Sequence, residues 1–495
     1  MKKYISKAVV LALVGCVALS SCKKFTDINT DPNQLLDADP TVVLPAAMGR
    51  IGFNMGSDIH RFTSLYVQQF AAQGNASSQP RQYDLYSVLE GDINNTWAAT
   101  FSGTLPDLQK VIAKTDGQSP FYAGIAKILK GYVYAVHVDA YGDLPYTEAT
   151  NYENNWTPKF DGSSLIYDKV FALLDEGIAN VKATSSLQVP AADDLIYGGN
   201  MQKWERFANA LKLRMYIHYF STNASAADMA KAKAGIEAII SGNKLLSNNG
   251  DNFQFRFLTL ANQTNPIHQF EGSRANQFFP SKTLVDLMTG KKDGRRAAYF
   301  TATSTTATDT VYKGATNGDP VESTAFSRMH TYIRGKVAAP NYNGEAPIRM
   351  LTFAEQNLIL AEYYARAQGG NNLGTAQTYF TAAINASFDA AKEFSDVTTE
   401  GFRVASNLAA YKRANGELVA ATALRQIIEE KFVSNYGVAV EPWSDWRRTG
   451  FPVLIPVSPA TQLPRILPYS FTERSYNPNV PARASVYDKA VFWDK

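Results

Sequence analysis

The side chain with the most defined chemistry in this sequence is the thiol of Cys22. It follows Leu19-Ser20-Ser21, at the end of an apolar run from Ala8 to Leu19 that is preceded by lysines. A basic start, a short apolar run and small residues before a cleavage point are typical of a secretory signal. A cysteine in this position indicates a lipoprotein signal, in which Cys22 is acylated and becomes the first residue of the mature chain. We therefore predict a signal peptide over residues 1–21 and a lipidated leader over residues 22–40.

Two other interpretations of this stretch are weaker. An uncleaved membrane helix needs about 20 apolar residues to cross a bilayer, and the run from Ala8 to Leu19 is much shorter. Cleavage before Cys16 would shorten the apolar run further and would leave Val17 to Leu19 on the surface. Because both cysteines of the chain lie in this region, the mature protein has no internal disulfide, and its stability must come from core burial.

The sequence holds no recognisable catalytic or metal-binding motif. Its five histidines are scattered, without a His-Glu-x-x-His pattern or cysteine partners, so no zinc site is expected. A Gly-x-Ser-x-Gly elbow, a phosphate-binding loop and a Gly-x-Gly-x-x-Gly fingerprint are also missing. We interpret the acidic pairs Glu429–Glu430 and Asp193–Asp194 as solvated, although the spacing of a glycosidase carboxylate pair does not show in a sequence. We therefore expect no catalytic residue, no metal and no cofactor.

Charge and composition exclude several classes of partner. The chain has 45% apolar and 19% charged residues and a net charge of +3, and the three lysines of the signal region account for that charge. A neutral mature chain is not expected to bind nucleic acid or an acidic membrane surface. No later stretch has 18 consecutive apolar residues, so the only expected membrane contact is the lipid on Cys22.

The elements that must position any site are helical by their periodicity. Apolar residues recur at helical spacing between capping signals near 119–142, 164–181, 201–220, 225–242, 352–369, 373–384 and 420–436. Thr352 and Glu355 are predicted to form a capping box. The helix that they begin and the next one make a pair of roughly 35 residues, with a stripe of alanines opposite Phe380. Such a pair is typical of tetratricopeptide repeats, and a generic helical hairpin fits nearly as well.

We therefore predict an all-α fold class, in which tetratricopeptide-like helical pairs form a scaffold with long irregular loops and a few short strands. A single helical domain is expected over residues 41–495. Loop insertions are expected near residues 243–282 and 301–347, where Thr310 to Tyr312 is a strand-like run. Long loops on a helical scaffold are where binding usually occurs.

Several blocks of this chain resemble the SusD/RagB family. In order along the mature chain they are Asn29–Asn33 (NTDPN), His137–Tyr146 (HVDAYGDLPY), Trp204–Arg214 (WERFANALKLR), Ser281–Arg295 (SKTLVDLMTGKKDGR), the helix Ile427–Tyr436 and Glu441–Gly450 (EPWSDWRRTG). The resemblance implies a helical, lipid-anchored outer-membrane protein that faces the cell surface of a Bacteroidetes bacterium. It also implies that the protein captures a glycan and delivers it to a partner SusC-like TonB-dependent transporter.

Most of these motif residues are interpreted as structural. Trp443 and Trp446 lie beside Arg447 and Arg448 in the sequence. Arginine pairs well with both aromatic faces and carboxylates. The block therefore predicts a buried aromatic platform with cation–π or carboxylate pairing.

The ligand-binding residues are then expected in loops where aromatic rings accompany amide or guanidinium groups. A ring stacks on the C–H face of a sugar, and the polar groups bond to its hydroxyls. The candidates fall in three groups: Arg81, Tyr83, Tyr86, Asn94 and Trp97; Asn276, Gln277, Phe278 and Phe279; and Tyr332 and Tyr342.

Glycan uptake without enzymatic activity is the function that these observations predict. Three alternatives stay open at this point. They are a peptide-binding, RagB-like uptake lipoprotein, a surface glycoside hydrolase, and a purely structural scaffold for envelope complexes.

Overall fold

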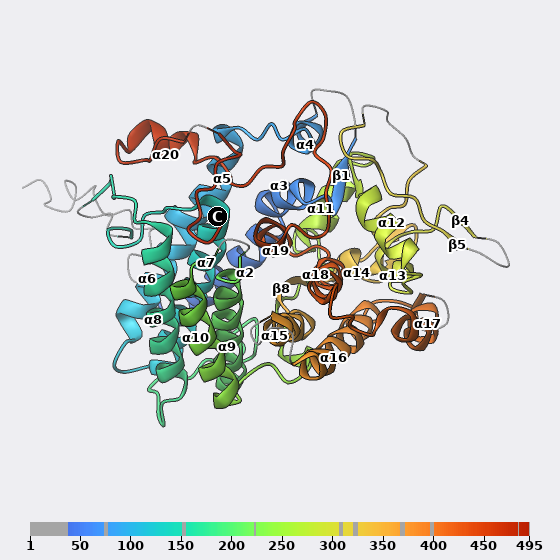
Figure 1. Ribbon diagram of the computed structural model, residues 1–495. Helices are drawn as coiled ribbons and strands as arrows, with labels where there is room; N and C mark the ends of the chain where they lie inside the picture. Colours follow the sequence, from blue (N-terminus) through green and yellow to red (C-terminus); the bar gives the residue numbers. More distant parts are fainter. Residues whose placement is uncertain are drawn as a thin grey trace, which may run out of the picture. The chain divides into compact units, whose positions relative to one another are not determined.

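The computed structural model describes residues 38–73, 78–150, 155–221, 224–305, 310–319, 325–366, 372–396, 400–483 and 485–494. In this part of the chain, packed helices make the architecture and the strands are short (Figure 1). The predicted fold class, all-α with tetratricopeptide-like helical pairs, is confirmed. The predicted signal peptide and Cys22 lie outside the described residues. Among the residues described, none of the helices has the length and apolar character needed to traverse a lipid bilayer.

The first elements of the described chain include helices that line the cavities discussed below. They are α2 (Pro40–Met55), α3 (Asp58–Tyr66), α4 (Gln79–Asp84), the short 3₁₀ turn η2 (Glu90–Ile93), α5 (Asn94–Trp97), the π-helix η3 (Ala98–Thr104) and α6 (Leu105–Thr115). Helix α2 packs on α6 and on η3. This packing holds α5 and η3 against the helical scaffold.

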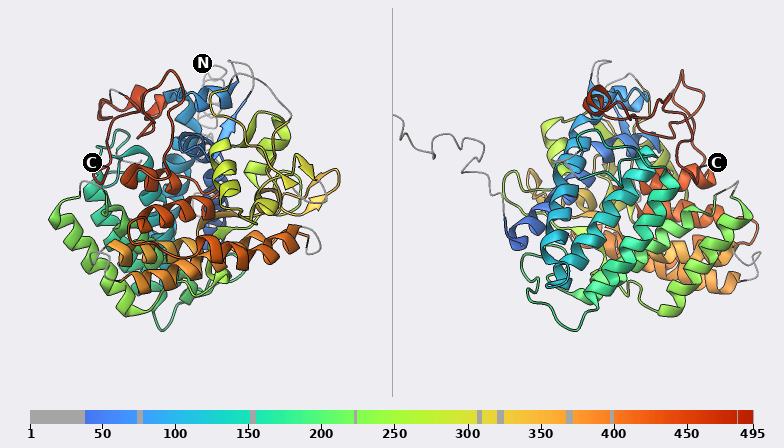
Figure 2. Two further views of the ribbon diagram at one scale, coloured as in Figure 1. Left: turned by 45° about the vertical axis from the view of Figure 1, so that its right-hand side comes forward. Right: turned by 90° about the vertical axis from the view of Figure 1, so that its left-hand side faces the viewer.

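Four long helices follow, and the periodicity predicts each of them. They are α7 (Pro120–Tyr141), α8 (Ser163–Val181), α9 (Met201–His218) and α10 (Ala226–Gly242). Helices α7 and α8 pack along their length and lie side by side (Figures 1 and 2). Glycines permit this close approach, because a Cβ on Gly177 would lie 2.8 Å from Cγ1 of Ile128, and a Cβ on Gly124 would lie 2.7 Å from Cγ1 of Val181.

The predicted tetratricopeptide-like pair consists of α15 (Phe353–Arg366) and α16 (Leu373–Ala391). Helices α17 (Glu400–Asn415), α18 (Ala423–Ser434) and α19 (Glu441–Thr449) follow it. Thr352 caps α15, since its Oγ1 accepts a bond from the Glu355 N–H at 3.1 Å. The other half of the predicted capping box is wrong, because the Glu355 carboxylate instead accepts a bond from Arg214 Nε at 2.6 Å.

The strands of the described chain pair antiparallel, two by two. The pairs are β1 (Phe70–Ala72) with β3 (Phe278–Pro280), β2 (Phe253–Phe255) with β8 (Ile348–Leu351), β4 (Ser304–Thr305) with β5 (Thr310–Val311), and β6 (Val337–Ala338) with β7 (Asn341–Tyr342). The shorter helical elements are η4 (Asn249–Asp251), α11 (Pro266–Ser273), α12 (Lys282–Gly290), α13 (Arg296–Tyr299), α14 (Thr331–Arg334) and α20 (Phe471–Tyr476). Segments 243–282 and 301–347 therefore contain short helices and strands as well as loops.

A buried ionic network joins α9, α15, α18 and α19. Its ion pairs are Arg214–Glu355, Lys431–Glu441, Arg448–Glu362 and Arg448–Asp445, with nitrogen–oxygen distances of 2.5 to 2.6 Å. Charges at this depth are tolerated because each has a partner. Arg214, Glu441, Asp445 and Arg448 come from the sequence blocks that resemble the SusD/RagB family, so these motif residues orient helices.

The aromatic platform predicted from the last of these blocks is confirmed for Trp443, whereas Trp446 is half-buried and lies under Arg465. The guanidinium carbon of Arg447 lies 3.9 Å from the ring centroid of Trp443, and both side chains are buried. The interpretation of the acidic pairs as solvated is wrong for both Glu429 and Glu430 and for Asp194, all of which are buried. Glu430 is buried and accepts a bond from Arg295 Nη1 at 2.6 Å. Asp194 is also buried, and its Oδ2 accepts a bond from the indole of Trp204 at 2.7 Å.

Candidate functional site

Helix α5 and the π-helix η3 that continues it separate two cavities. In η3, Thr104 Oγ1 donates to the carbonyl of Ala99, five residues earlier, at 2.9 Å. Thr100 bonds to the buried His137 ring at 2.8 Å, which ties η3 to α7. Segments of π-helix are rare in proteins, and those that occur are often found at functional sites. Asn95 on α5 lines both cavities, so the two adjoin.

The smaller cavity has a volume of about 290 Å³, and we call it the aromatic cavity. Trp97, Phe101 and Trp156 line it. The Trp97 ring stacks on Phe101, with their centroids 4.3 Å apart, and is itself only 5% exposed. Trp156 is 79% exposed, which is rare for so large an apolar side chain. The cavity therefore offers one accessible aromatic face beside a fixed aromatic wall.

Helix α20 fixes the polar groups on one side of the aromatic cavity. The Trp97 indole donates to Glu473 Oε2 at 3.1 Å. Asn94 Oδ1 accepts bonds from Ser470 Oγ at 2.8 Å and from the Thr472 N–H at 3.2 Å. Because the amide oxygen of Asn94 already has two donors, its NH₂ group is the part suited to bind a ligand oxygen.

A carboxylate and an amide face the aromatic cavity from the other side. Glu148 Oε2 accepts bonds from the Lys159 N–H at 3.0 Å and from Asn155 Nδ2 at 2.9 Å, and both Glu148 and Asn155 line the cavity. The backbone bond from Lys159, aided by the bond from Asn155, lowers the pKa of Glu148 below its ordinary value. Glu148 is therefore an ionised acceptor near neutral pH.

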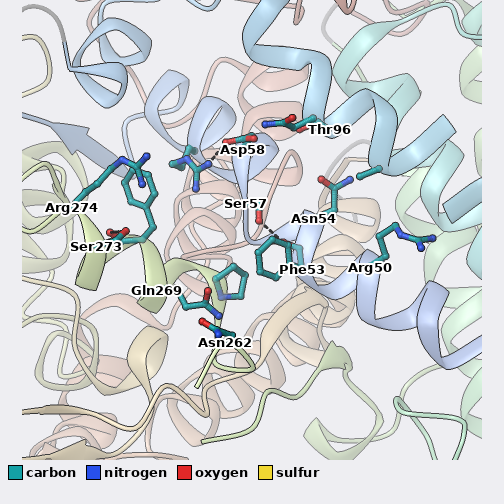
Figure 3. A pocket seen from close by; sticks show the side chains of 15 residues that line it. Arg50, Phe53, Asn54, Ser57, Asp58, Thr96, Asn262, Gln269, Ser273 and Arg274 are labelled. Carbon is teal, nitrogen blue, oxygen red and sulfur yellow. Dashed lines mark hydrogen bonds and ion pairs between the residues drawn. The ribbon is translucent and has the colours of Figure 1, made fainter. Parts of the chain in front are cut away.

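The larger cavity has a volume of about 690 Å³ and is lined by Arg50, Arg61 and Arg274, and we call it the arginine cavity. Figure 3 shows Arg50 on the α2 side and Arg274, which follows α11, on the other. Phe53 lies between them and is 48% exposed. Arg50 is ion-paired with Asp107, which does not line the cavity, at 2.6 Å.

Two of these arginines share one aromatic ring. The guanidinium carbons of Arg61 and Arg274 lie 4.3 Å and 4.9 Å from the centroid of Phe270. Arg61 is ion-paired with Asp58. Burial, together with the neighbouring positive charge of Arg274, lowers the pKa of Arg61 to about 10. In the part of the chain that the structure describes, the exposed Arg274 guanidinium makes no ion pair.

The chemistry that these two cavities offer is recognition of polar ligands. Exposed indole and carboxamide groups suit sugar rings and their hydroxyls, and guanidinium groups suit anions. Within the described ranges, no three side chains of His, Cys, Asp or Glu lie close enough together to hold a metal ion.

The structure brings two of the predicted ligand residues, Asn94 and Trp97, into the aromatic cavity. Several others lie inside the protein, namely Arg81, Tyr83, Tyr86, Phe278, Phe279 and Tyr332. Phe278 stacks on Phe70 at 4.6 Å between centroids, and Tyr332 lies under the Arg349 guanidinium at 3.8 Å. These rings fill the core because burial of an aromatic ring is strongly favourable.

The remaining predicted residues line neither cavity. Asn276 is exposed and accepts a bond from Arg328, and Gln277 is half-buried. Tyr342 is half-buried, with its hydroxyl 2.6 Å from His330 Nδ1 and the Arg334 guanidinium 4.1 Å from its ring centroid. The three predicted groups therefore do not meet in one site.

Sequence reasoning missed several residues that line the cavities. Trp156 had a usable signal, because it stands in the polar stretch Asn151–Thr157, where a tryptophan has little apolar sequence around it. Glu473, Arg61 and Arg274 gave no such signal, since each lies among residues of ordinary helix or loop composition. Only the fold shows that they line cavities beside α5.

Comparison with known proteins agrees with this architecture. The sequence pattern of the SusD-like family, described as starch-binding and associating with the outer membrane, matches residues 32–472. No curated protein matches the chain. A SusD/RagB family protein from Bacteroides thetaiotaomicron has 22% identity and a TM-score of 0.75, with 92% of this chain and 99% of that chain covered.

Two other solved structures are similar to this chain over nearly its whole length. A chitin-binding protein has 22% identity and a TM-score of 0.74, covering 92% of this chain and 100% of that chain. A chitin-binding SusD homolog from Flavobacterium johnsoniae has 21% identity and a TM-score of 0.70, covering 90% and 99%. At this level of identity the structures establish the fold, and the sequence pattern establishes the membership: this chain belongs to the SusD-like family.

Proposed function

We propose that this protein is a lipid-anchored receptor that captures oligosaccharide in the aromatic cavity and releases it uncleaved. The observation that carries this proposal is the 79% exposed ring of Trp156 in a cavity that also contains Trp97 and Phe101. An exposed indole loses little when a sugar ring covers it, and it gains the apolar contact of the sugar's C–H face.

The polar groups around Trp156 match the needs of sugar hydroxyls. Asn94 offers an NH₂ donor, because Ser470 and Thr472 occupy its oxygen. Glu148 offers ionised oxygens that accept hydroxyl protons. Each of these groups is held by a backbone or side-chain bond, so little conformational entropy is lost when a sugar binds.

The carboxylates in the aromatic cavity support binding without hydrolysis. A glycosidase needs a general acid whose pKa is raised, so that it carries a proton at neutral pH. The bonds from Lys159 and Asn155 lower the pKa of Glu148 instead. Glu473 is bonded to the Trp97 indole and to Asn477 Nδ2 at 2.7 Å, so it is engaged in holding α20 against α5.

The remaining parts of the proposal are the anchor and the partner. Cys22 carries the lipid in this account, and the outer membrane is the location, as the description of the matched family supports. We propose that a SusC-like TonB-dependent transporter receives the captured oligosaccharide. Copurification of such a transporter with the full-length protein from detergent-solubilised outer membranes tests the partner, and recovery of the protein alone would contradict it.

Isothermal titration of the mature chain against neutral oligosaccharides, including chitin and starch fragments, tests ligand capture. We expect binding without product formation, and a loss of about tenfold or more in affinity for Trp156→Ala, the size of one lost stacking contact. Tyr476→Ala is the matched control, because Tyr476 is also 79% exposed but lines neither cavity. Tight binding of peptides with no binding of glycans would favour the peptide-uptake alternative.

A further inference from the structure

The arginine cavity carries a positive charge, which is not needed to bind a neutral sugar. Among its lining residues are three arginines and one acid, Asp58. Asp58 pairs with Arg61, and Arg50 pairs with Asp107 from outside the cavity. The Arg274 guanidinium is left as an exposed cation that is held in place by the ring of Phe270.

The two guanidinium groups over Phe270 are close together, and within the described residues only Arg61 has a carboxylate partner, Asp58. Each guanidinium carbon lies within 5 Å of the same ring centroid, so the two positive charges are less than about 10 Å apart. The effect of Arg274 on Arg61, whose pKa falls to about 10 largely through burial, has the sign expected of like charges. An anion placed against both guanidiniums would relieve that repulsion and would receive charge-assisted bonds.

The rest of the cavity wall suits a sugar. Asn54, Asn95, Asn262 and Gln269 supply carboxamides, which both donate to and accept from hydroxyls. Asn54 Nδ2 is tied to Thr100 Oγ1 at 3.3 Å, and Gln269 Nε2 is tied to the carbonyl of Thr264 at 2.7 Å, so both amides are oriented. Figure 3 shows Asn54, Asn262 and Gln269 around the exposed ring of Phe53.

The two cavities also share one lining residue. Asn95 lines both, and the neighbouring residues of α5 divide between them, with Thr96 in the arginine cavity and Trp97 in the aromatic cavity. Because the cavities adjoin at α5, an oligosaccharide that rests on Trp156 and extends past this helix would reach the arginine cavity. A ligand of several linked sugar units can span both cavities, whereas a separate small anion cannot.

We propose that the arginine cavity binds an anionic substituent, a carboxylate or a sulfate ester, on the oligosaccharide whose other units occupy the aromatic cavity. The proposal rests on the proposed function and narrows its ligand to acidic glycans. Arg274 is the principal contact, and Arg61, whose guanidinium also lies over Phe270, adds positive charge.

The test compares ligands that differ only in charge. Tetragalacturonate is titrated against its fully methyl-esterified form, and a sulfated carrageenan tetrasaccharide against its desulfated form. The carboxylate and sulfate arms show which anion the cavity takes. We expect the charged member of at least one pair to bind about tenfold or more tightly, with an advantage that shrinks as NaCl is raised.

Arg274→Gln should abolish that advantage and leave the affinity for the uncharged member within about twofold. Arg413→Gln, an equal change of charge on an exposed residue of α17 that lines neither cavity, should leave both affinities unchanged. If uncharged and charged glycans bind equally well, or if Arg274→Gln does not alter the difference, this inference is overturned and glycan capture stands. If no glycan binds, or if an acidic peptide alone binds, both proposals fail.

Discussion

The buried histidine of the ionic network makes stability depend on pH in a defined direction. His218 is fully buried, with Nδ1 2.9 Å from the hydroxyl of Tyr167 and 3.4 Å from Asp139 Oδ2, and with Nε2 3.2 Å from Glu441 Oε2. Burial alone would lower the pKa of His218, but the attraction of Asp139 and Glu441 outweighs it and raises the pKa from 6.5 to about 9. In the folded protein at neutral pH, His218 is therefore in its imidazolium form.

The size of the effect follows from this shift. A rise from 6.5 to about 9, at about 1.4 kcal/mol for each pKa unit, corresponds to about 3 kcal/mol of folding stability. Because the folded-state pKa is the higher one, this contribution is complete below pH 6.5 and is lost as the pH rises through 9. Between pH 7 and 9.5 the protein should lose about 2 kcal/mol of unfolding free energy from this residue.

Urea denaturation of the mature chain, followed by circular dichroism from pH 7 to 9.5, measures this loss. We expect His218→Gln to lower stability at pH 7 and to remove this part of the pH dependence. Burial lowers the pKa of Lys130 to about 8, so through this residue the free energy of unfolding rises with pH above 8. The effect of His218 is therefore measured as the difference between the pH profiles of wild type and His218→Gln. His60→Gln is the control, because burial lowers the pKa of His60 to about 3 and it stays neutral throughout this range. Parallel pH profiles for wild type and His218→Gln would refute the assignment of charge to His218.

Two further outcomes are expected. Gly177→Leu should destabilise the protein by about 1–3 kcal/mol, measured as a lower urea midpoint, because the added side chain would meet Ile128 on α7 where the two helices pack closely. Gly162→Leu is the control, because a side chain at Gly162 meets open space and should change the midpoint little. Cys22→Ala should leave the fold unchanged by circular dichroism but move the protein from the membrane fraction to the soluble fraction, and salt-resistant retention of the variant in the membrane fraction would contradict the anchor.

Local patterns were sufficient to predict the four helices α7 to α10, but not α2 or α17. Ser119-Pro120 and Gly142 bracket α7, and the Ser225 side chain caps α10 by accepting a bond from the Asp228 N–H at 3.1 Å. Such signals depend only on neighbours within one turn, so a single sequence contains them. The same reasoning failed for Glu355 and Glu430, whose buried partners Arg214 and Arg295 lie more than 130 residues away in the sequence.

The candidate site was predictable only in part, for the same reason. Asn94 and Trp97 were predicted from their types, but the residues that complete their surroundings, Trp156 and Glu473 on α20, are distant in the sequence. Composition also cannot separate an aromatic ring that binds from one that fills the core. Phe279 and Trp156 both stand near polar residues in the sequence, yet the first is 0% and the second 79% exposed, because only Phe279 belongs to a paired strand.

A crystal structure of the mature chain with the oligosaccharide that binds most tightly in the titrations tests the central claim most directly. The account predicts a sugar ring stacked on the Trp156 indole, with a hydroxyl within hydrogen-bonding distance of Asn94 Nδ2 or of the Glu148 carboxylate. A ligand bound elsewhere, with Trp156 left exposed and the aromatic cavity unoccupied, would contradict it.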